Sequence, residues 1–265
     1  GKRGDSYILA SESCALTAVD AKFVRDILPG EIVTITENGI KSDSRLIEES
    51  KAAHIPHAHC IFEYIYFARL DSTMDNVNIY DARIRAGKAL AASYPVEADL
   101  VTGVPDSGLA AAMGYAQACG LPFALAFHKN SYVGRTFIKP TQKERESAVH
   151  LKLSVLSSVV KGKRLVLIDD SIVRGTTMAS LIRMLKDAGA TEVHVRISSP
   201  PFLFPCYYGT DVPSNDQLIA SSHTAAEICA SIGADSLGYM KLEDLKQMTG
   251  DLPLCKACFD SHYPV

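Results

Sequence analysis

The sequence predicts an α/β fold with a doubly wound, mainly parallel sheet and helices on both of its faces. Between residues 78 and 198, segments with helical spacing alternate with short apolar segments, which is typical of parallel βαβ units. One apolar segment, residues 164–168, ends at two adjacent acids, Asp169 and Asp170. The first 44 residues differ, because their turn-rich alternating pattern predicts antiparallel β-structure before the α/β part.

The N-terminal segment is expected to form antiparallel strands. Apolar residues at 7–9 are followed by period-two alternation over residues 31–36. The pair Asn38-Gly39 comes next, and this pair is a strong indicator of a two-residue hairpin turn. Residues 1–50 are therefore predicted to be a unit distinct from the α/β part.

Helices and strands then follow in alternation. The predicted helices have apolar side chains at helical spacing and comprise residues 79–94, 107–119 and 176–188. The predicted strands are short and apolar and comprise residues 99–104, 122–127, 164–168 and 192–197. Because the strands of such units are parallel, their carboxyl ends share one edge of the sheet, where ligands bind.

Composition limits the class of protein. With 265 residues, 47% of them hydrophobic, the chain can bury a sizeable core, and its formal net charge of −3 argues against a nucleic-acid or membrane partner. No apolar stretch approaches the roughly 18 residues of a membrane helix and no signal peptide precedes the first strand, so a cytoplasmic location is expected. Since the chain begins at Gly1 without an initiator methionine, we expect a fragment or a processed piece.

The turn after the 164–168 strand is the strongest candidate for a ligand site. A helix follows it, so free backbone N–H groups can bind a phosphate, and Gly175 allows close approach of the backbone. The hydroxyls that can assist are those of Ser171, Thr176 and Thr177. Asp169 and Asp170 suit sugar hydroxyls or a hydrated Mg2+, and the alternative is an N-cap aspartate beside a solvated one. The turn therefore predicts a site for a phosphorylated sugar.

Two more loops fall at the same edge. Residues 105–108 end a strand and open a helix, so they either present free amides to an anion or cap the helix through Asp106 or Ser107. Residues 128–145 form a long loop without periodicity, which predicts a lid, or alternatively a solvated basic loop. Its cations, which could neutralise an anionic substrate, are Lys129, Arg135, Lys139, Lys143 and Arg145.

The seven cysteines include candidates for a metal site. Cys255 and Cys258 form a CxxC pair, which fits a zinc half-site, a redox pair or a coincidence, and four sulfur ligands are needed in total. Cys60 and Cys206 stand out because each lies in a segment that links two blocks. The other cysteines are expected to be small core residues, namely Cys14, Cys119 and Cys229. The histidines before Cys60 lack a matching second half and are expected to be partly exposed, namely His54, His57 and His59.

The run VLIDDSIVRGTT, residues 166–177, resembles the signature of type I phosphoribosyltransferases. Nearly all of the flanking chain, including YILASES, PGEIVTI and ENG, resembles the amidophosphoribosyltransferase family. This resemblance implies a type I phosphoribosyltransferase fold, preceded by an antiparallel β remnant of an N-terminal-nucleophile glutaminase domain. It also implies conversion of phosphoribosylpyrophosphate (PRPP) and ammonia to 5-phosphoribosylamine and pyrophosphate, the first step of purine biosynthesis. The alternatives are a purine-base salvage phosphoribosyltransferase and a PRPP-sensing regulatory protein.

The resemblance implies roles for particular residues. Asp169 and Asp170 would bind the ribose hydroxyls and the associated Mg2+, with Ser107 contributing to the Mg2+ site. The turn that would cradle the 5-phosphate comprises Ser171, Ile172, Val173, Arg174, Gly175, Thr176 and Thr177. The pyrophosphate loop would comprise Asp106, Ser107 and Gly108. The basic loop would cover the site and complete an ammonia passage. Its contacts with the substrate would include Lys129, Tyr132 and Arg135, with Lys129 and Arg135 acting in catalysis beside the acidic pair.

One branch of the family carries a structural 4Fe-4S cluster. The sequence contexts of its four ligands match Cys60, Cys206, Cys255 and Cys258, with zinc as the alternative occupant. The resemblance also implies feedback inhibition by purine nucleotides and assembly into a homotetramer. It further implies an upstream glutaminase part that supplies ammonia from glutamine. The expected organisation has four parts. Residues 1–50 are a glutaminase remnant, and residues 51–77 are an interdomain linker with the start of the transferase. Residues 78–200 are the transferase core, and residues 201–265 are a C-terminal helical segment with cluster ligands.

Overall fold

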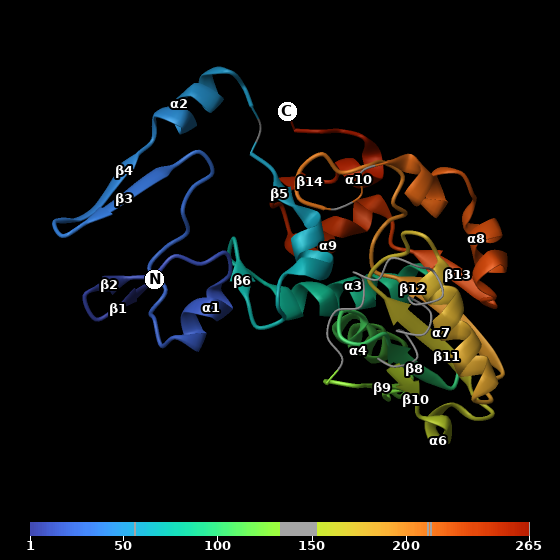
Figure 1. The fold of residues 1–265 in the computed structure, drawn as a ribbon. Coiled ribbons are helices and arrows are strands. Elements are labelled where there is room, and N and C mark those ends of the chain that lie inside the picture. The colour runs from blue at the N-terminus through green and yellow to red at the C-terminus, as the bar shows by residue number, and fades with distance from the viewer. Residues whose placement is uncertain (56, 133–152, 211, 213, 265) are drawn as a thin grey trace.

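The structure, a computed structural model, describes residues 1–55, 57–132, 153–210, 212 and 214–264. Figure 1 shows two parts, with the N-terminal segment in blue to one side of an α/β body that contains the remaining elements. The boundary between the parts follows the change of pattern in the sequence.

The N-terminal segment consists of hairpins and two short helices. Strands β1 (Lys2–Arg3) and β2 (Ser6–Tyr7) pair antiparallel, as do β3 (Ile32–Thr36) and β4 (Gly39–Asp43). The helices are α1 (Ser13–Ala18) and α2 (Arg45–Ala52). Gly39 has a φ of +110°, a backbone conformation that favours glycine, at the turn between β3 and β4. The predicted antiparallel hairpin is therefore confirmed, and Cys14 is buried as expected.

The connection to the α/β body is short and irregular. It contains β5 (His59–Cys60), a π-helix η1 (Glu63–Phe67), and the antiparallel pair β6 (Thr73–Met74) and β7 (Val77–Asn78). A π-helical turn is rare and is found frequently at functional sites.

A four-stranded parallel sheet forms the centre of the body. Its order is β13-β12-β11-β8, and its strands are β8 (Leu100–Gly103), β11 (Arg164–Asp169), β12 (Glu192–Ile197) and β13 (Ser236–Tyr239). Ile168 is in register with Gly103, and Asp169 with Ile197, which in turn faces Tyr239. The carboxyl ends of all four strands therefore share one edge, as the sequence predicts.

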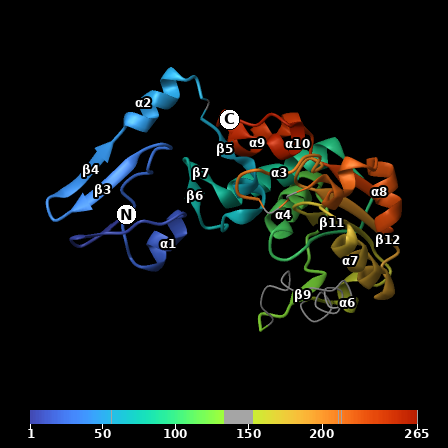
Figure 2. The same cartoon turned by 45° about the horizontal axis from the view of Figure 1, so that its top comes forward.

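Helices cover both faces of this sheet (Figure 2). Side chains of β11 alternate: Val166 and Ile168 pack in the core with α3 (Ile79–Ser93) and α4 (Gly108–Cys119), whereas Leu165 and Leu167 pack with α7 (Thr176–Asp187) and α8 (Ala225–Ile232). Because both of its faces are buried, β11 is a continuous apolar run instead of an alternating one. This arrangement confirms the doubly wound fold.

The remaining elements lie around this body. They are β9 (Phe127–Lys129), β10 (Leu153–Val155), α6 (Ser157–Val160), η2 (Asn215–Gln217), η3 (Ile219–Ser221), η4 (Leu242–Asp244), α9 (Leu245–Thr249), β14 (Leu254–Cys255) and α10 (Ala257–Asp260). Strand β14 pairs in parallel with β5, so the C-terminal segment returns to the connection between the two parts.

Two predictions are wrong. The segment 122–127 is not a regular strand: Phe123 makes one isolated bridge to Val101, and β9 begins only at Phe127 and pairs antiparallel with β10. Two backbone hydrogen bonds join the segment to β8, from the Val101 N–H to the Pro122 carbonyl (2.9 Å) and from the Ala124 N–H to the Val101 carbonyl (3.1 Å). The N–H of Ala126 then donates to the Thr102 hydroxyl (3.0 Å) and not to the backbone of β8. Cys119 is exposed at the end of α4, although helical spacing predicted a core residue.

Candidate active site

The acidic pair lies at the end of the central strand β11. Asp169 is its last residue and is partly buried, while Asp170 follows it and is 7% exposed. The N–H of Asp170 donates to Asp169 Oδ1 (2.9 Å), and the N–H of Ser198 donates to the Asp169 carbonyl (2.9 Å). The pair is therefore fixed by the backbone of two neighbouring strands.

Burial dominates the electrostatics of the pair. It raises the pKa of Asp169 well above its ordinary value, and the adjacent Asp170 carboxylate raises it further. Burial also raises the pKa of Asp170, although hydrogen bonds from Ser107 and Ser171 oppose this rise. Two buried carboxylates in contact favour any ligand that brings positive charge or hydroxyl donors.

The turn at residues 105–108 lies against this pair. Ser107 donates to Asp170, which brings together two residues that are 63 positions apart in the sequence and were predicted to share a site. The peptide bond between Pro105 and Asp106 is cis. Asp106 forms an ion pair with Lys129 of β9, so these two predicted site residues meet each other.

Gly108 has a structural role that the sequence did not predict. A Cβ at this position would lie 2.4 Å from the Ile168 carbonyl oxygen and 3.2 Å from Asp169 Cα. The first residue of α4 therefore touches the backbone of β11 directly, next to the acidic pair. Only a residue without a side chain permits this contact.

The turn at residues 171–177 presents its backbone N–H groups. Within the described ranges, none of these seven N–H groups donates a hydrogen bond. Helix α7 begins at Thr176, and its N-cap Gly175 has a φ of +79° and no side chain to cap the helix. A row of unpaired N–H groups at a helix N-terminus is an anion site.

The side chains of this turn differ in their contacts. Ser171 donates to Asp170 and Arg174 donates to Gln217, while Thr176 and Thr177 are exposed. Ile172 is buried and the Val173 carbonyl accepts from the Ile219 N–H (2.9 Å), so these two anchor the turn. A hollow of about 570 Å³ opens beside Arg174 and is lined further by Asp216, Gln217, Leu218, Ile219, Ser222 and His223.

The basic loop is described only in part. Lys129 and Tyr132 are described, and the Tyr132 side chain is fully exposed. The predicted contact Arg135 lies outside the described residues, as do Lys139, Lys143 and Arg145.

Three separate segments bring the four predicted cluster cysteines together. Cys60 of β5 is in register with Cys255 of β14. The carbonyl of Cys258 accepts from Leu203 and Phe204, which lead to Cys206. Burial raises the pKa of the Cys258 thiol, and repulsion from Cys60, Cys206 and Cys255 raises it further, so all four sulfurs lie within electrostatic range.

Among the described residues, no three or more histidine, cysteine, aspartate or glutamate side chains are close enough to hold a single metal ion. This result bears on the two metal predictions differently. Mg2+ keeps several waters and is bound by one or two carboxylates together with substrate phosphates, so the Asp169–Asp170 pair fits it. For the four cysteines, the same result supports neither occupant, so the 4Fe-4S cluster and the alternative zinc ion both stay predictions.

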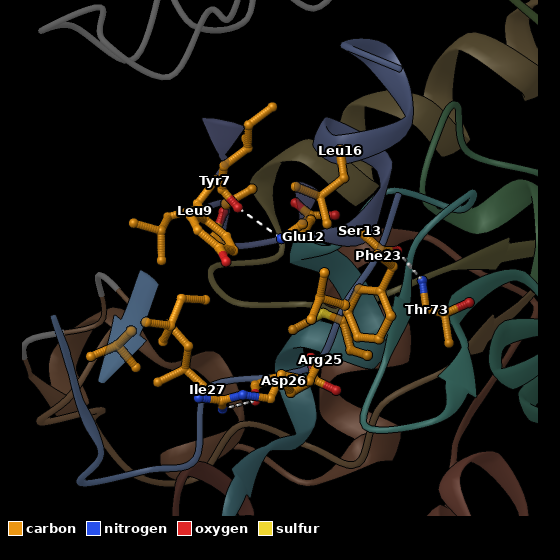
Figure 3. Close-up of a pocket in the computed structure, with 18 of the residues that line it drawn as sticks. Tyr7, Leu9, Glu12, Ser13, Leu16, Phe23, Arg25, Asp26, Ile27 and Thr73 are labelled. Carbon is orange, nitrogen blue, oxygen red and sulfur yellow. Dashed lines mark hydrogen bonds between the residues drawn. The ribbon is translucent and has the colours of Figure 1, made fainter. Parts of the chain in front are cut away.

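A second hollow lies far from these strand ends. It has a volume of about 250 Å³ and is lined by the N-terminal segment and by residues 73–75 (Figure 3). Its lining includes the apolar side chains of Leu9, Phe23 and Ile27. Neither of the turns described above reaches it.

The sequence analysis did not identify Arg83 as a neighbour of the acidic pair. This side chain is 4% exposed in α3, and its charge interacts with Asp170. A signal was present, because Arg83 lies at helical spacing between the apolar residues Ile79 and Ala86 on the buried face of the helix.

Fold and site together define a type I phosphoribosyltransferase domain. A family model described as phosphoribosyl transferase domain matches residues 73–198, which include both turns and the acidic pair. The structure of glutamine PRPP amidotransferase from Bacillus subtilis, complexed with ADP and GMP, superposes with a TM-score of 0.87 at 48% identity. The superposition covers 100% of this chain and 58% of that chain.

Relatives by sequence agree over the whole length of the chain. It is 49% identical to the amidophosphoribosyltransferases of Bacillus subtilis and Archaeoglobus fulgidus, and the alignments cover 100% of this chain. The chain belongs to the amidophosphoribosyltransferase family. It spans 56% and 58% of the length of these two relatives. In the described residues, no helix is long and apolar enough to cross a membrane.

Proposed function

We propose that the chain carries the phosphoribosyl-transfer half of an amidophosphoribosyltransferase. In the reaction, the nitrogen of ammonia bonds to C1 of PRPP, the bond from C1 to the pyrophosphate oxygen breaks, and a proton leaves the nitrogen. The observation that carries this proposal is the Asp169–Asp170 pair beside the unpaired N–H groups of residues 171–177, in a chain 49% identical to named enzymes over its full length.

The acidic pair would bind the ribose. Asp169 and Asp170 can accept hydrogen bonds from the two ring hydroxyls, because both carboxylates lie at the open carboxyl edge of the sheet. The same carboxylates and the Ser107 hydroxyl would hold Mg2+, which would neutralise charge on the pyrophosphate leaving group when bound. The raised pKa of Asp169 supports this assignment, since a buried carboxylate favours a cationic ligand.

The two turns would bind the two ends of PRPP. Residues 171–177 would donate their backbone N–H groups to the 5-phosphate, with the exposed hydroxyls of Thr176 and Thr177 beside them. Residues 106–108 and Lys129 would bind the pyrophosphate, in which case the Asp106–Lys129 ion pair opens or moves when substrate binds. Positioning and electrostatic stabilisation would supply most of the rate, and no side-chain nucleophile is needed. We assign Tyr132 and Arg135 to the loop that would close over this site when PRPP binds.

The domain organisation follows from the same proposal. Residues 1–50 would be the end of a glutaminase domain, 51–77 the linker, 78–200 the transferase core and 201–265 the C-terminal segment. The antiparallel hairpins before the parallel sheet support this division. In the longer protein, ammonia would come from glutamine hydrolysed upstream.

The four cysteines are proposed to bind a structural 4Fe-4S cluster. Cys60, Cys206, Cys255 and Cys258 come from three segments that are held together by backbone hydrogen bonds and by the β5–β14 pairing. Burial acts to raise the pKa of Cys206, but N–H donors from Tyr208 and Thr210 outweigh it and the pKa is lowered, which suits a thiolate ligand. Iron and labile sulfide analysis of anaerobically purified protein tests this, and stoichiometric zinc without iron would contradict it.

Regulation and assembly are proposed by similarity. The Bacillus subtilis relative was solved with ADP and GMP, which supports purine nucleotides as inhibitors of this chain. A homotetramer and a cytoplasmic location are proposed on the resemblance described above.

The function is tested by pyrophosphate release from PRPP and Mg2+ with different acceptors. We expect release with ammonia, none with glutamine alone, and none with adenine, guanine or hypoxanthine. Release with a purine base and not with ammonia would identify a salvage enzyme instead. PRPP binding without release under any acceptor would favour a PRPP-sensing protein.

A further inference from the structure

The buried arginine Arg83 ties the linker to the transferase core. It lies on α3, it is 4% exposed, and its guanidinium donates to the carbonyls of Tyr64 (2.9 Å) and Ala68 (2.8 Å). These carbonyls belong to the π-helix η1 and to the residue just after it. One side chain thus holds the irregular backbone of the linker from both ends.

No carboxylate forms a hydrogen bond or ion pair with this guanidinium within the described part of the chain. Burial of a cation without a directly paired anion is costly, and it lowers the pKa of Arg83. The charges that offset this cost act from a distance: the largest contribution comes from Asp170 of the acidic pair, and Glu12 and Glu63 follow. A leucine or methionine would fill the same space without this cost, so the charge itself calls for an explanation.

Glu12 connects the same region to the N-terminal segment. Its Oε2 accepts hydrogen bonds from the Ser72 hydroxyl (2.7 Å) and from the Arg69 N–H (2.8 Å). Beside it, Ser13 Oγ accepts from the Thr73 N–H (2.8 Å), which Figure 3 shows as a dashed line. The segment 68–73 is thus held by Arg83 from the core side and by Glu12 and Ser13 from the N-terminal side.

We propose that Arg83 is a positioning residue for the acidic pair: it supplies a fixed, buried positive charge on α3, whose Ala82 and Ala86 pack in one core with Val166 and Ile168 of β11, the strand that ends at this pair. This charge favours binding of PRPP, a polyanion. The proposal rests on the proposed function. Its charge offsets the repulsion between the two carboxylates and the phosphates of the substrate, while its two carbonyl contacts keep the guanidinium from moving.

Arg196 offers a matched control. It is also buried (3% exposed), and its guanidinium donates to the carbonyls of Tyr94 (3.1 Å) and Val195 (2.8 Å). Burial lowers its pKa as well, but the groups that interact with its charge are Tyr115, Tyr94 and Cys229, and neither acidic-pair residue is among them. A change at Arg196 therefore reports the cost of losing a buried arginine without a change in the charge that interacts with Asp170.

The experiment compares the full chain with its Arg83→Lys, Arg83→Gln and Arg196→Gln variants. PRPP binding is measured by calorimetry at saturating Mg2+, the kcat for pyrophosphate release with ammonia is measured separately, and thermal unfolding gives the stability of each variant. We expect Arg83→Gln to raise the Kd for PRPP on the order of tenfold, or about 1.4 kcal/mol. Arg83→Lys should stay within about threefold of the unchanged chain, because the charge remains. Arg196→Gln should lose stability and keep its Kd.

The outcomes separate the effect of the Arg83 charge on PRPP binding from a general loss of stability. Equal Kd values in the folded Lys and Gln variants, or an equal rise in Arg196→Gln, would overturn the role of charge. If Arg83→Gln does not fold, Arg83→Met takes its place as the uncharged variant that fills the same space: a Kd equal to that of Arg83→Lys would contradict the proposal, and a Kd about tenfold higher would support it. If PRPP binds but no pyrophosphate is released with ammonia, the proposed function fails while the Kd values still test Arg83. If the unchanged chain does not bind PRPP, both fail.

Discussion

Substitution of Gly108 by alanine tests whether direct backbone contact positions the site. The new Cβ would lie 2.4 Å from the Ile168 carbonyl oxygen, about 1 Å less than an ordinary contact of 3.4 Å. That carbonyl cannot turn away freely, because it also accepts the N–H of Val104 (2.9 Å). The 105–108 turn therefore has to move from the end of β11 by a distance of about 1 Å.

Two effects of this substitution oppose each other. Alanine favours the helix and restricts the unfolded chain, which together stabilise by roughly 0.5–1 kcal/mol. Overpacking against backbone costs roughly 1–3 kcal/mol. We expect the second effect to win, with a loss of about 1–2 kcal/mol and a fall in Tm of several degrees, about 2–4 °C for each kcal/mol. A 1 Å displacement of binding groups can reduce turnover by about a hundredfold. We therefore expect kcat/KM for PRPP to fall on the order of a hundredfold even at temperatures where the variant remains folded.

The assay is thermal unfolding together with pyrophosphate release over a range of PRPP concentrations. Gly209→Ala is the control, because a Cβ there would meet nothing within 4 Å, and we expect its Tm and kcat/KM to be unchanged. If Gly108→Ala kept the Tm and kcat/KM of the unchanged chain, the backbone contact would have no role and the reasoning would be refuted.

Three further predictions concern the acids, the helix packing and the sulfurs. Asp169→Asn should raise the Tm at pH 7 without Mg2+ and abolish pyrophosphate release. The pKa of Asp169 is raised in the folded chain, so the stability of the folded state falls as pH rises from about 3.8 through that folded pKa, and asparagine avoids this loss. A lower Tm in the variant would contradict the reasoning. Gly87→Ala would place a Cβ 1.8 Å from the Ala111 carbonyl oxygen in α4, so urea unfolding should show a loss of about 3 kcal/mol or more, against no change for the exposed Lys88→Ala. Cys258→Ser should abolish iron and sulfide binding, whereas the exposed Cys119→Ser should retain both, and equal metal contents would exclude the cysteine assignment.

The sequence predicted the parallel sheet and the position of two acids at the end of its central strand, because a strand that is buried on both faces has an uninterrupted apolar sequence. Strand β11 is covered on both faces, so its apolar run ends sharply at Asp169, and the position of the site follows from that end. The segment 122–127 shows the limit of such patterns. Its apolar residues also lie next to β8, but Ala126 bonds to the Thr102 side chain instead of to a strand, and no local pattern encodes that choice.

Long-range pairing explains the other differences. Lys129 and Asp106 were predicted as separate ligands of the substrate, and in the structure they form an ion pair with each other. Arg83 gave a visible signal as a lone cation on an apolar helix face, yet its role depends on Tyr64, Ala68 and Asp170, which come from two other segments of the chain. Such contacts are set by tertiary structure and cannot be derived from residue spacing.

The way this site is built also limits what it can select. The proposed contacts to the 5-phosphate are backbone N–H groups of residues 171–177, and the contact between Gly108 and β11 also involves backbone. Backbone groups and two carboxylates recognise a phosphate and a ribose, which are common to every reaction that uses PRPP. Choice of the acceptor therefore has to come from groups outside this set. The candidates are the loop that begins at Lys129 and the N-terminal segment that Glu12 holds against residues 69–73. Under the proposed function, the acidic turn therefore indicates PRPP as the substrate, and the flanking chain indicates ammonia as the acceptor.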